Sequence, residues 1–143
     1  MNKIKINSNF NNDKNQTIKI KKYRDLKLTF NFSFLTKDKK YNLSKSNGID
    51  KDVRLKILEK VHELSQINLS DVYLESKIHG FEKLAEIPWM KVHSDFLNTG
   101  RFHDCSNGYW VFRLSKKGRV IGKINNNIFY ILAIDTKFNL YDH

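Results

Sequence analysis

Cysteine, proline and long hydrophobic runs are nearly absent from this sequence. Cys105 is the only cysteine, which excludes an intrachain disulfide and any zinc site built from several cysteines. No apolar run approaches the ~20 residues that cross a bilayer, so we expect a soluble protein without a membrane partner. Residues 1–10 contain lysines but neither a continuous apolar segment nor a small-residue cleavage site. We therefore expect no secretory signal and a cytoplasmic location.

The common signatures of nucleotide-binding and hydrolytic enzymes are also missing. No G-x-x-x-x-G-K-[ST], G-x-G-x-x-G or G-x-S-x-G motif occurs. The residue types that ligate metals do gather in one stretch, as His93, Asp95, His103, Asp104 and Cys105. Their spacing matches neither a closed zinc site nor a His-x-x-x-His helical pair. The sequence therefore predicts no metal and no cofactor.

Positive charge is what the sequence has in excess. Lysine and arginine number 26 against 15 acidic residues, for a net charge of +11. The excess lies in residues 1–50 and 101–143, at the two ends of the chain. Such a distribution suits a nucleic acid or an acidic membrane surface, because neutralising phosphates releases their condensed counterions. An acidic protein partner, or no polyanion at all, is the alternative.

The length of the chain suits one domain. Residues 1–22, rich in Asn and Lys, read as a basic arm that is either mobile or an irregular edge strand. Residues 23–143 then form a single α+β domain. It begins with residues 26–34, whose apolar side chains alternate strictly with polar ones. This alternation predicts a half-buried strand, with a possible short return strand at residues 41–43.

Helical spacing follows in the middle of the chain. Asp50 is placed to cap a helix over residues 51–66, whose apolar stripe Leu58 widens. A second, shorter helix is predicted over residues 70–76. Residues 81–85 read as another helical turn, and residues 87–92 as a strand or extended link around the proline.

The last third of the sequence predicts three consecutive antiparallel strands. They cover residues 109–115, 119–124 and 128–135, joined by tight turns. The third is apolar on both sides, as expected of a central strand that is covered on both faces, or of one with an aromatic side chain on its working face. The expected fold class is α+β, in which this C-terminal meander and an N-terminal strand form an antiparallel sheet packed against one long and one short helix.

The register of this meander segregates its side chains. If residues 116–118 form a three-residue turn, Ser115 opposes Arg119 and Arg113 opposes Ile121. Side chains alternate between faces, so this register places one group of polar and cationic residues together: Tyr109, Arg113, Arg119 and Lys123. The opposite face is apolar. We therefore expect one core face and one cationic face suited to phosphate, with ordinary surface solvation as the alternative for any single side chain.

Groups suited to cleaving RNA lie at and beyond the last strand. Cleavage requires activation of the 2′-hydroxyl, neutralisation of the phosphorane charge and protonation of the leaving oxygen. Arginine and lysine supply the second function, and tyrosine or histidine the others. Lys137, Tyr141 and His143 are candidates in the terminal segment, and Tyr109 offers a ring on which a base can stack.

The order of elements and these residues resemble the RelE/ParE/HigB superfamily of bacterial toxins, over residues 26–143. Members of its ribonuclease branch fold as a β-α-α-β-β-β layer and cut messenger RNA on the ribosome. The resemblance implies that Arg119 stabilises the transition state, that Lys137 is a second basic residue and that Tyr141 is the terminal catalytic tyrosine. Arg113 and Lys123 become supporting phosphate contacts. The chain departs from the family at Asp135, where many relatives have a small residue or an arginine.

Two classes of function compete at this point. The leading hypothesis is a toxin-like, metal-independent endoribonuclease that acts on mRNA at the ribosome, with Arg119, Tyr141 and His143 as catalytic residues. An acidic antitoxin would cover its cationic face. The rival is a non-enzymatic basic module of a phage or mobile element, which binds nucleic acid or protein as an inhibitor or anti-defence factor. A third hypothesis is an interaction domain that binds no nucleic acid.

Overall fold

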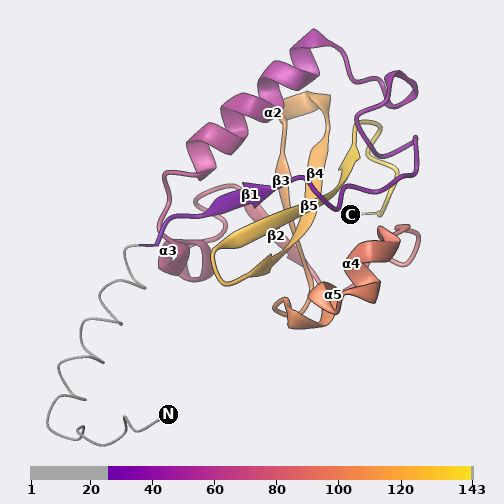
Figure 1. Ribbon diagram of the computed structural model, residues 1–143. Helices are drawn as coiled ribbons and strands as arrows, with labels where there is room; N and C mark the ends of the chain where they lie inside the picture. The colour runs from indigo at the N-terminus through magenta and orange to yellow at the C-terminus, as the bar shows by residue number, and fades with distance from the viewer. Residues whose placement is uncertain (1–25, 143) are drawn as a thin grey trace, which may run out of the picture.

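The computed structural model describes residues 26–142 as a five-stranded mixed sheet with helices on both faces (Figure 1). The strand order is β1-β5-β4-β3-β2. The strands are β1 (Thr29–Asn31), β2 (Phe81–Leu84), β3 (Tyr109–Arg113), β4 (Arg119–Asn125) and β5 (Ile128–Asp135). The helices are α2 (Lys51–Leu64), α3 (Leu69–Leu74), α4 (Ser94–Asn98) and α5 (Arg101–Asp104), with 3-10 turns η2 (Lys45–Asn47) and η3 (Ser115–Lys117). The α+β class is confirmed, whereas the proposed arm, residues 1–22, and His143 lie outside the described residues.

The C-terminal meander is present as predicted, and β5 lies inside the sheet between β4 and β1. The N-terminal strand also joins the sheet, but it runs parallel to β5, with Phe30 beside Phe129. The sheet is therefore mixed rather than antiparallel throughout. A parallel neighbour needs a long crossover connection. Here the connection from β1 to β5 contains most of the described chain.

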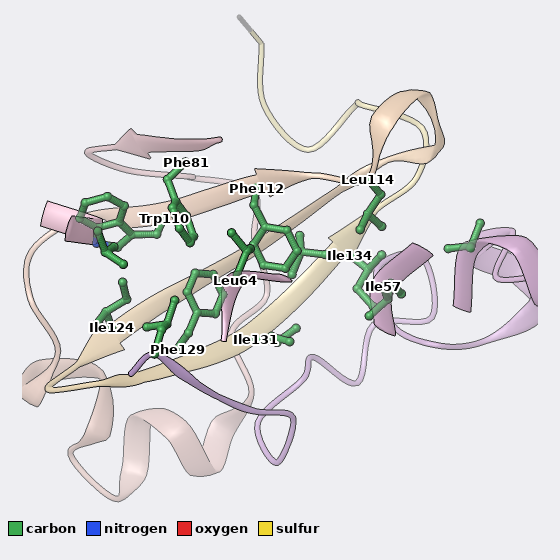
Figure 2. Close-up of a cluster of buried hydrophobic side chains, with 14 of the residues drawn as sticks. Ile57, Leu64, Phe81, Trp110, Phe112, Leu114, Ile124, Phe129, Ile131 and Ile134 are labelled. Atoms are coloured by element: carbon green, nitrogen blue, oxygen red, sulfur yellow. The ribbon is translucent and has the colours of Figure 1, made fainter. Parts of the chain in front are cut away.

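One face of the sheet forms a core with α2 and α3 (Figure 2). Asp50 begins α2 by accepting the Val53 N–H at 2.9 Å, which satisfies one of the free donors of the first turn. Ile57 and Leu64 then point from the helix toward the sheet, where Phe112 is among the side chains they meet. Leu58 does not widen this stripe, because its side chain is 65% exposed.

The other face of the sheet is also covered, although the predicted register made it an open cationic face; only the two-sided apolar character of residues 128–134 had indicated cover. In Figure 1, α4 and α5 lie on the side of the sheet opposite α2. They contribute Phe96 and Phe102 to a second core that includes Val111 of β3 and Leu132 of β5. The segment that follows β5 completes this core with Leu140. Strands covered on both faces explain why β5 is apolar on both sides.

Two local predictions were wrong. Residues 81–85 form no helical turn; β2 lies there instead, because pairing with β3 buries Phe81 against Phe112 in the first core. The first strand ends at Asn31, whose side chain accepts the Ser33 N–H in a turn. The turn carries Phe34 to the opposite face, where its ring packs on the second core. The possible return strand at residues 41–43 is absent as well, and residues 87–92 form the link around the proline that was the alternative to a strand.

Candidate nucleic-acid interface

The β3–β4 connection sets the register of the predicted cationic residues. Arg113 pairs with Arg119 and Val111 with Ile121, two residues away from the predicted register. The loop is longer than expected because η3 occupies residues 115–117 and the Leu114 N–H bonds to the Gly118 carbonyl at 2.8 Å. A shift of two residues leaves each side chain on its predicted face. Tyr109, Arg113, Arg119 and Lys123 therefore share one face.

That face is not a solvent-facing cationic surface, and this expectation was wrong. The second core covers it, so the side chain of Arg119 is fully buried and Lys123 is 5% exposed. Of the predicted group, only Arg113 is exposed. The sequence pattern specified which side chains share a face. It did not reveal that α4, α5 and the chain end would cover them.

Arg119 is held by a buried ion pair. Its Nε and Nη2 both lie 2.9 Å from Oδ2 of Asp135, the residue opposite it on β5. Nη2 also donates to the carbonyl oxygen of Tyr141 at 2.8 Å. Asp135 accepts two further backbone N–H groups, from Asn139 at 3.1 Å and Leu140 at 3.0 Å. This pair therefore anchors the segment after β5 to the sheet.

Tyr141 lies directly over Arg119. The guanidinium carbon is 3.5 Å from the centre of the tyrosine ring, a cation–π contact, and Phe138 stacks near the same group at 5.4 Å. The Tyr141 hydroxyl donates to Oε1 of Glu82 on β2 at 3.0 Å. Burial is the main reason that the pKa of Tyr141 rises to about 12; Arg119 opposes the rise and Glu82 adds to it. At neutral pH this phenol is a proton donor and not a base.

Lys123 and Tyr109 lie together at the other end of β4. Lys123 is four positions beyond Arg119 along β4, about 13 Å at the usual strand rise. Lys123 Nζ donates to the Gly108 carbonyl at 2.9 Å and lies 4.8 Å from the centre of the Tyr109 ring. Burial lowers the pKa of Lys123 and raises that of Tyr109. The predicted site residues thus divide into two groups.

Exposed basic side chains gather at the end of the sheet where β3 ends and β4 begins. We call this the basic end surface, and its members are Lys40, Lys45, Arg113, Lys116, Lys117 and Lys137. Three separate segments meet here. Gly118 approaches Thr136 so closely that an added Cβ would lie 2.9 Å from its Cα. Thr136 Oγ1 donates to the carbonyl of Asn47 at 2.7 Å, which ties η2 to the same place.

A small cavity of about 220 Å³ opens on the basic end surface. Lys40 and Lys137 line it, together with Tyr41 and Asn139, and Asp135 lies at its base. The Tyr41 hydroxyl donates to Oδ1 of Asn139 at 2.9 Å. The cavity therefore combines two ammonium groups with amide and hydroxyl groups, a set suited to a phosphate oxygen.

The sequence analysis selected four residues near this end of the sheet: Arg113, Arg119, Lys137 and Tyr141. It missed Glu82, which accepts a hydrogen bond from Tyr141, and Phe138, which stacks near Arg119. Glu82 belongs to a strand that was read as a helical turn. Phe138 carried no signal beyond its type. The sequence analysis noted Asp135 only as a departure from a family pattern. An acidic residue at the end of an apolar strand, opposite an arginine on the neighbouring strand, is a signal of an internal ion pair. His143 lies outside the described residues.

No protein-family model, curated protein or solved structure matches this chain significantly. Within residues 26–142, no helix is long and apolar enough to cross a membrane. In the same range, no three His, Cys, Asp or Glu side chains lie close enough together to hold a metal ion.

Proposed function

We propose that this protein is a non-catalytic RNA-binding module whose contact surface is the basic end surface. One observation carries the proposal: lysines from three separate segments converge on the end of a rigid sheet. Two lysines come from the 40–45 loop, two from η3 and one from the segment after β5. Lysine side chains on a fixed frame contact phosphates without reading bases.

The placement of acidic groups supports a polyanionic ligand. Three aspartates near these lysines in sequence make contacts within the protein. Asp38 accepts the backbone N–H of Lys40 at 3.0 Å, and Asp50 caps α2. Asp135 is fully buried in its ion pair. Six basic side chains remain against Asp38, Asp50 and the exposed Asp142, so the local net charge is positive.

We favour RNA over a membrane as the partner because the basic end surface contains a cavity in addition to its positive charge. A phosphate oxygen would fit the space between Lys40 and Lys137, where the side-chain amide N–H groups of Asn139 can donate to it. The backbone of a single strand presents such oxygens one nucleotide at a time. Arg113, beside Phe138 at 5.4 Å, adds a planar cation at the edge of the surface.

A salt titration tests this proposal. The affinity for a fluorescein-labelled single-stranded RNA is measured by anisotropy at increasing salt, for wild type and for the triple variant Lys116→Gln/Lys117→Gln/Lys137→Gln. Each phosphate contact contributes about 0.7 to the slope of log K against log salt for a single strand. The triple variant should lower the slope by about 2. A matched control with the same loss of charge, away from this surface, is Lys27→Gln/Lys83→Gln/Lys91→Gln.

The outcomes distinguish the partner classes. If the two triple variants bind equally well, the basic end surface is not the contact. If wild type does not bind RNA at low salt, the module is not an RNA-binding protein. Binding to vesicles that contain acidic lipid, in place of RNA, would move the partner to a membrane surface.

A metal-independent endoribonuclease on ribosome-bound mRNA is the second candidate, with an acidic antitoxin as its partner. The observation that favours it is the stacking of Tyr141 on Arg119, beside Arg113 on the neighbouring strand. A phosphate would reach Arg119 only after the segment of residues 136–142 moved. Tyr141→Phe keeps the stacked ring and removes the proton donor. Primer extension on translated message should show cleavage by wild type and its loss in this variant; an intact message with wild type excludes the activity.

A further inference from the structure

A second cavity lies on the sheet face that carries Arg119 and Lys123, at the end opposite the basic end surface. Its volume is about 470 Å³, within the range of small-molecule sites. Lys123 and Tyr109 come from the sheet, Phe102 from α5, and Ile87 and Pro88 from the loop after β2. Elements from three parts of the chain therefore line one open concave space with both apolar and polar walls.

Lys123 is a buried cation without a counter-ion. Its side chain is 5% exposed, and its one printed hydrogen bond is to the carbonyl of Gly108 at 2.9 Å. Within residues 26–142, no Asp or Glu forms an ion pair with it. The rings of Phe102 and Tyr109 lie 4.6 Å and 4.8 Å from Nζ and shield it from water.

An ammonium group has three donors, and burying a charge that is not paired is costly. A carbonyl and two aromatic rings offset part of that cost, but they leave donor capacity and the full positive charge in place. Because Lys123 lines the cavity, an anion bound there would supply both the missing acceptors and the counter-charge.

The walls define the class of anion. Ile87, Pro88 and Phe102 offer an apolar surface to a hydrocarbon or ring, while Lys123 is the single basic residue of the lining. Glu86 also lines the cavity, so a dianion would face its carboxylate. We propose that this cavity binds a small organic carboxylate, with its anionic group on Lys123 and its apolar body against the walls.

Calorimetric titration with phenylacetate tests this assignment. 2-Phenylethanol serves as the neutral analogue and phenyl phosphate as the dianion. Phenylacetate should bind more tightly than either. If the alcohol binds as tightly as phenylacetate, Lys123 does not contribute to recognition; if phenyl phosphate binds more tightly, the carboxylate assignment is wrong.

The variant Lys123→Met keeps an unbranched chain between the two rings and removes the charge. It should bind phenylacetate about 10- to 100-fold more weakly, the loss expected for a hydrogen-bonded charge pair. Lys91→Met is the matched control, since Lys91 is exposed and lines neither this cavity nor its neighbour, and it should bind as wild type does. Equal affinity of Lys123→Met and wild type would overturn the proposal.

A second readout does not depend on the folding of the variant. In the wild-type protein, millimolar phenylacetate should shift the backbone amide resonances of Gly108 and Tyr109, next to Lys123. The absence of any shift there would also overturn the proposal. RNA binding by Lys123→Met should stay at the wild-type level, because this cavity and the basic end surface lie at opposite ends of β4.

Discussion

Breaking the ion pair between Arg119 and Asp135 should destabilise the protein more than any other single polar substitution in the second core. Asp135→Asn preserves shape and volume but leaves the guanidinium without its counter-charge. Both side chains are fully buried, so water cannot replace the lost carboxylate. Oδ1 of Asp135 also accepts the N–H of Asn139 and Oδ2 that of Leu140; an asparagine amide keeps only one acceptor oxygen, so the segment after β5 loses part of its anchor as well.

The magnitude follows from this burial. Removing one partner of a buried pair destabilises a protein by about 3–5 kcal/mol, because an uncompensated charge remains. An ordinary domain is stable by only about 5–15 kcal/mol. In the double variant Arg119→Met/Asp135→Asn, no buried charge is left unpaired. Its loss of stability should therefore be smaller than the sum of the losses in the two single variants. We expect a coupling energy of about 2 kcal/mol or more.

Urea unfolding of the four proteins of this double-mutant cycle measures the coupling, with the fluorescence of the buried Trp110 as the signal. The control is the exposed pair Lys60 and Glu63, at 3.5 Å on α2. Lys60→Met should cost less than about 1 kcal/mol, as exposed pairs do. A cost of that small size for Asp135→Asn, or a coupling energy near zero, would refute the assigned role of the pair.

Three further predictions concern single side chains. Gly122→Ala should destabilise by at least about 2 kcal/mol, because an added Cβ would lie 2.2 Å from the Tyr130 carbonyl oxygen; an unchanged melting temperature would contradict this close approach. Burial raises the pKa of Cys105 from 9.0 to about 11, so its stabilisation is present below pH 9 and lost as pH rises to 11. Wild type should lose about 2 kcal/mol more than Cys105→Ala over that range in urea unfolding, and equal losses would contradict the burial of the thiol. Tyr141→Phe should cost about 1 kcal/mol through its lost bond to Glu82, and a wild-type urea midpoint would show that this bond contributes nothing.

Strong local periodicity explains what could be predicted. α2 was predicted within two residues of its observed end, because Asp50 marks its start and Val53, Ile57 and Leu64 repeat at helical spacing. The meander strands alternate, and tight turns limit their register. Arg119 and Lys123 lie on their predicted face of the sheet although the predicted register was wrong. The error was two residues, and side chains alternate between faces at every residue.

Short elements could not be predicted in the same way. α4 and α5 contain five and four residues, too few for a helical period to repeat. β2 is four residues long and owes its conformation to pairing with β3 rather than to its own composition. Phe102 of α5 and the loop after β2 line the candidate carboxylate cavity, and β2 supplies Glu82, so the site was only partly predictable.

The sequence by itself determined which side chains share a face of the sheet, because alternation along a strand is a local property of the backbone. Only the tertiary structure decided what that face meets. Segments distant in sequence, Phe96 of α4 and Leu140 after β5, cover it and exclude water. The same residues that would have been phosphate contacts on an open face thereby become a buried ion pair at Arg119 and a caged ammonium at Lys123. The surface charge that remains for a polyanion lies at the end of the sheet, where loops from three parts of the chain meet.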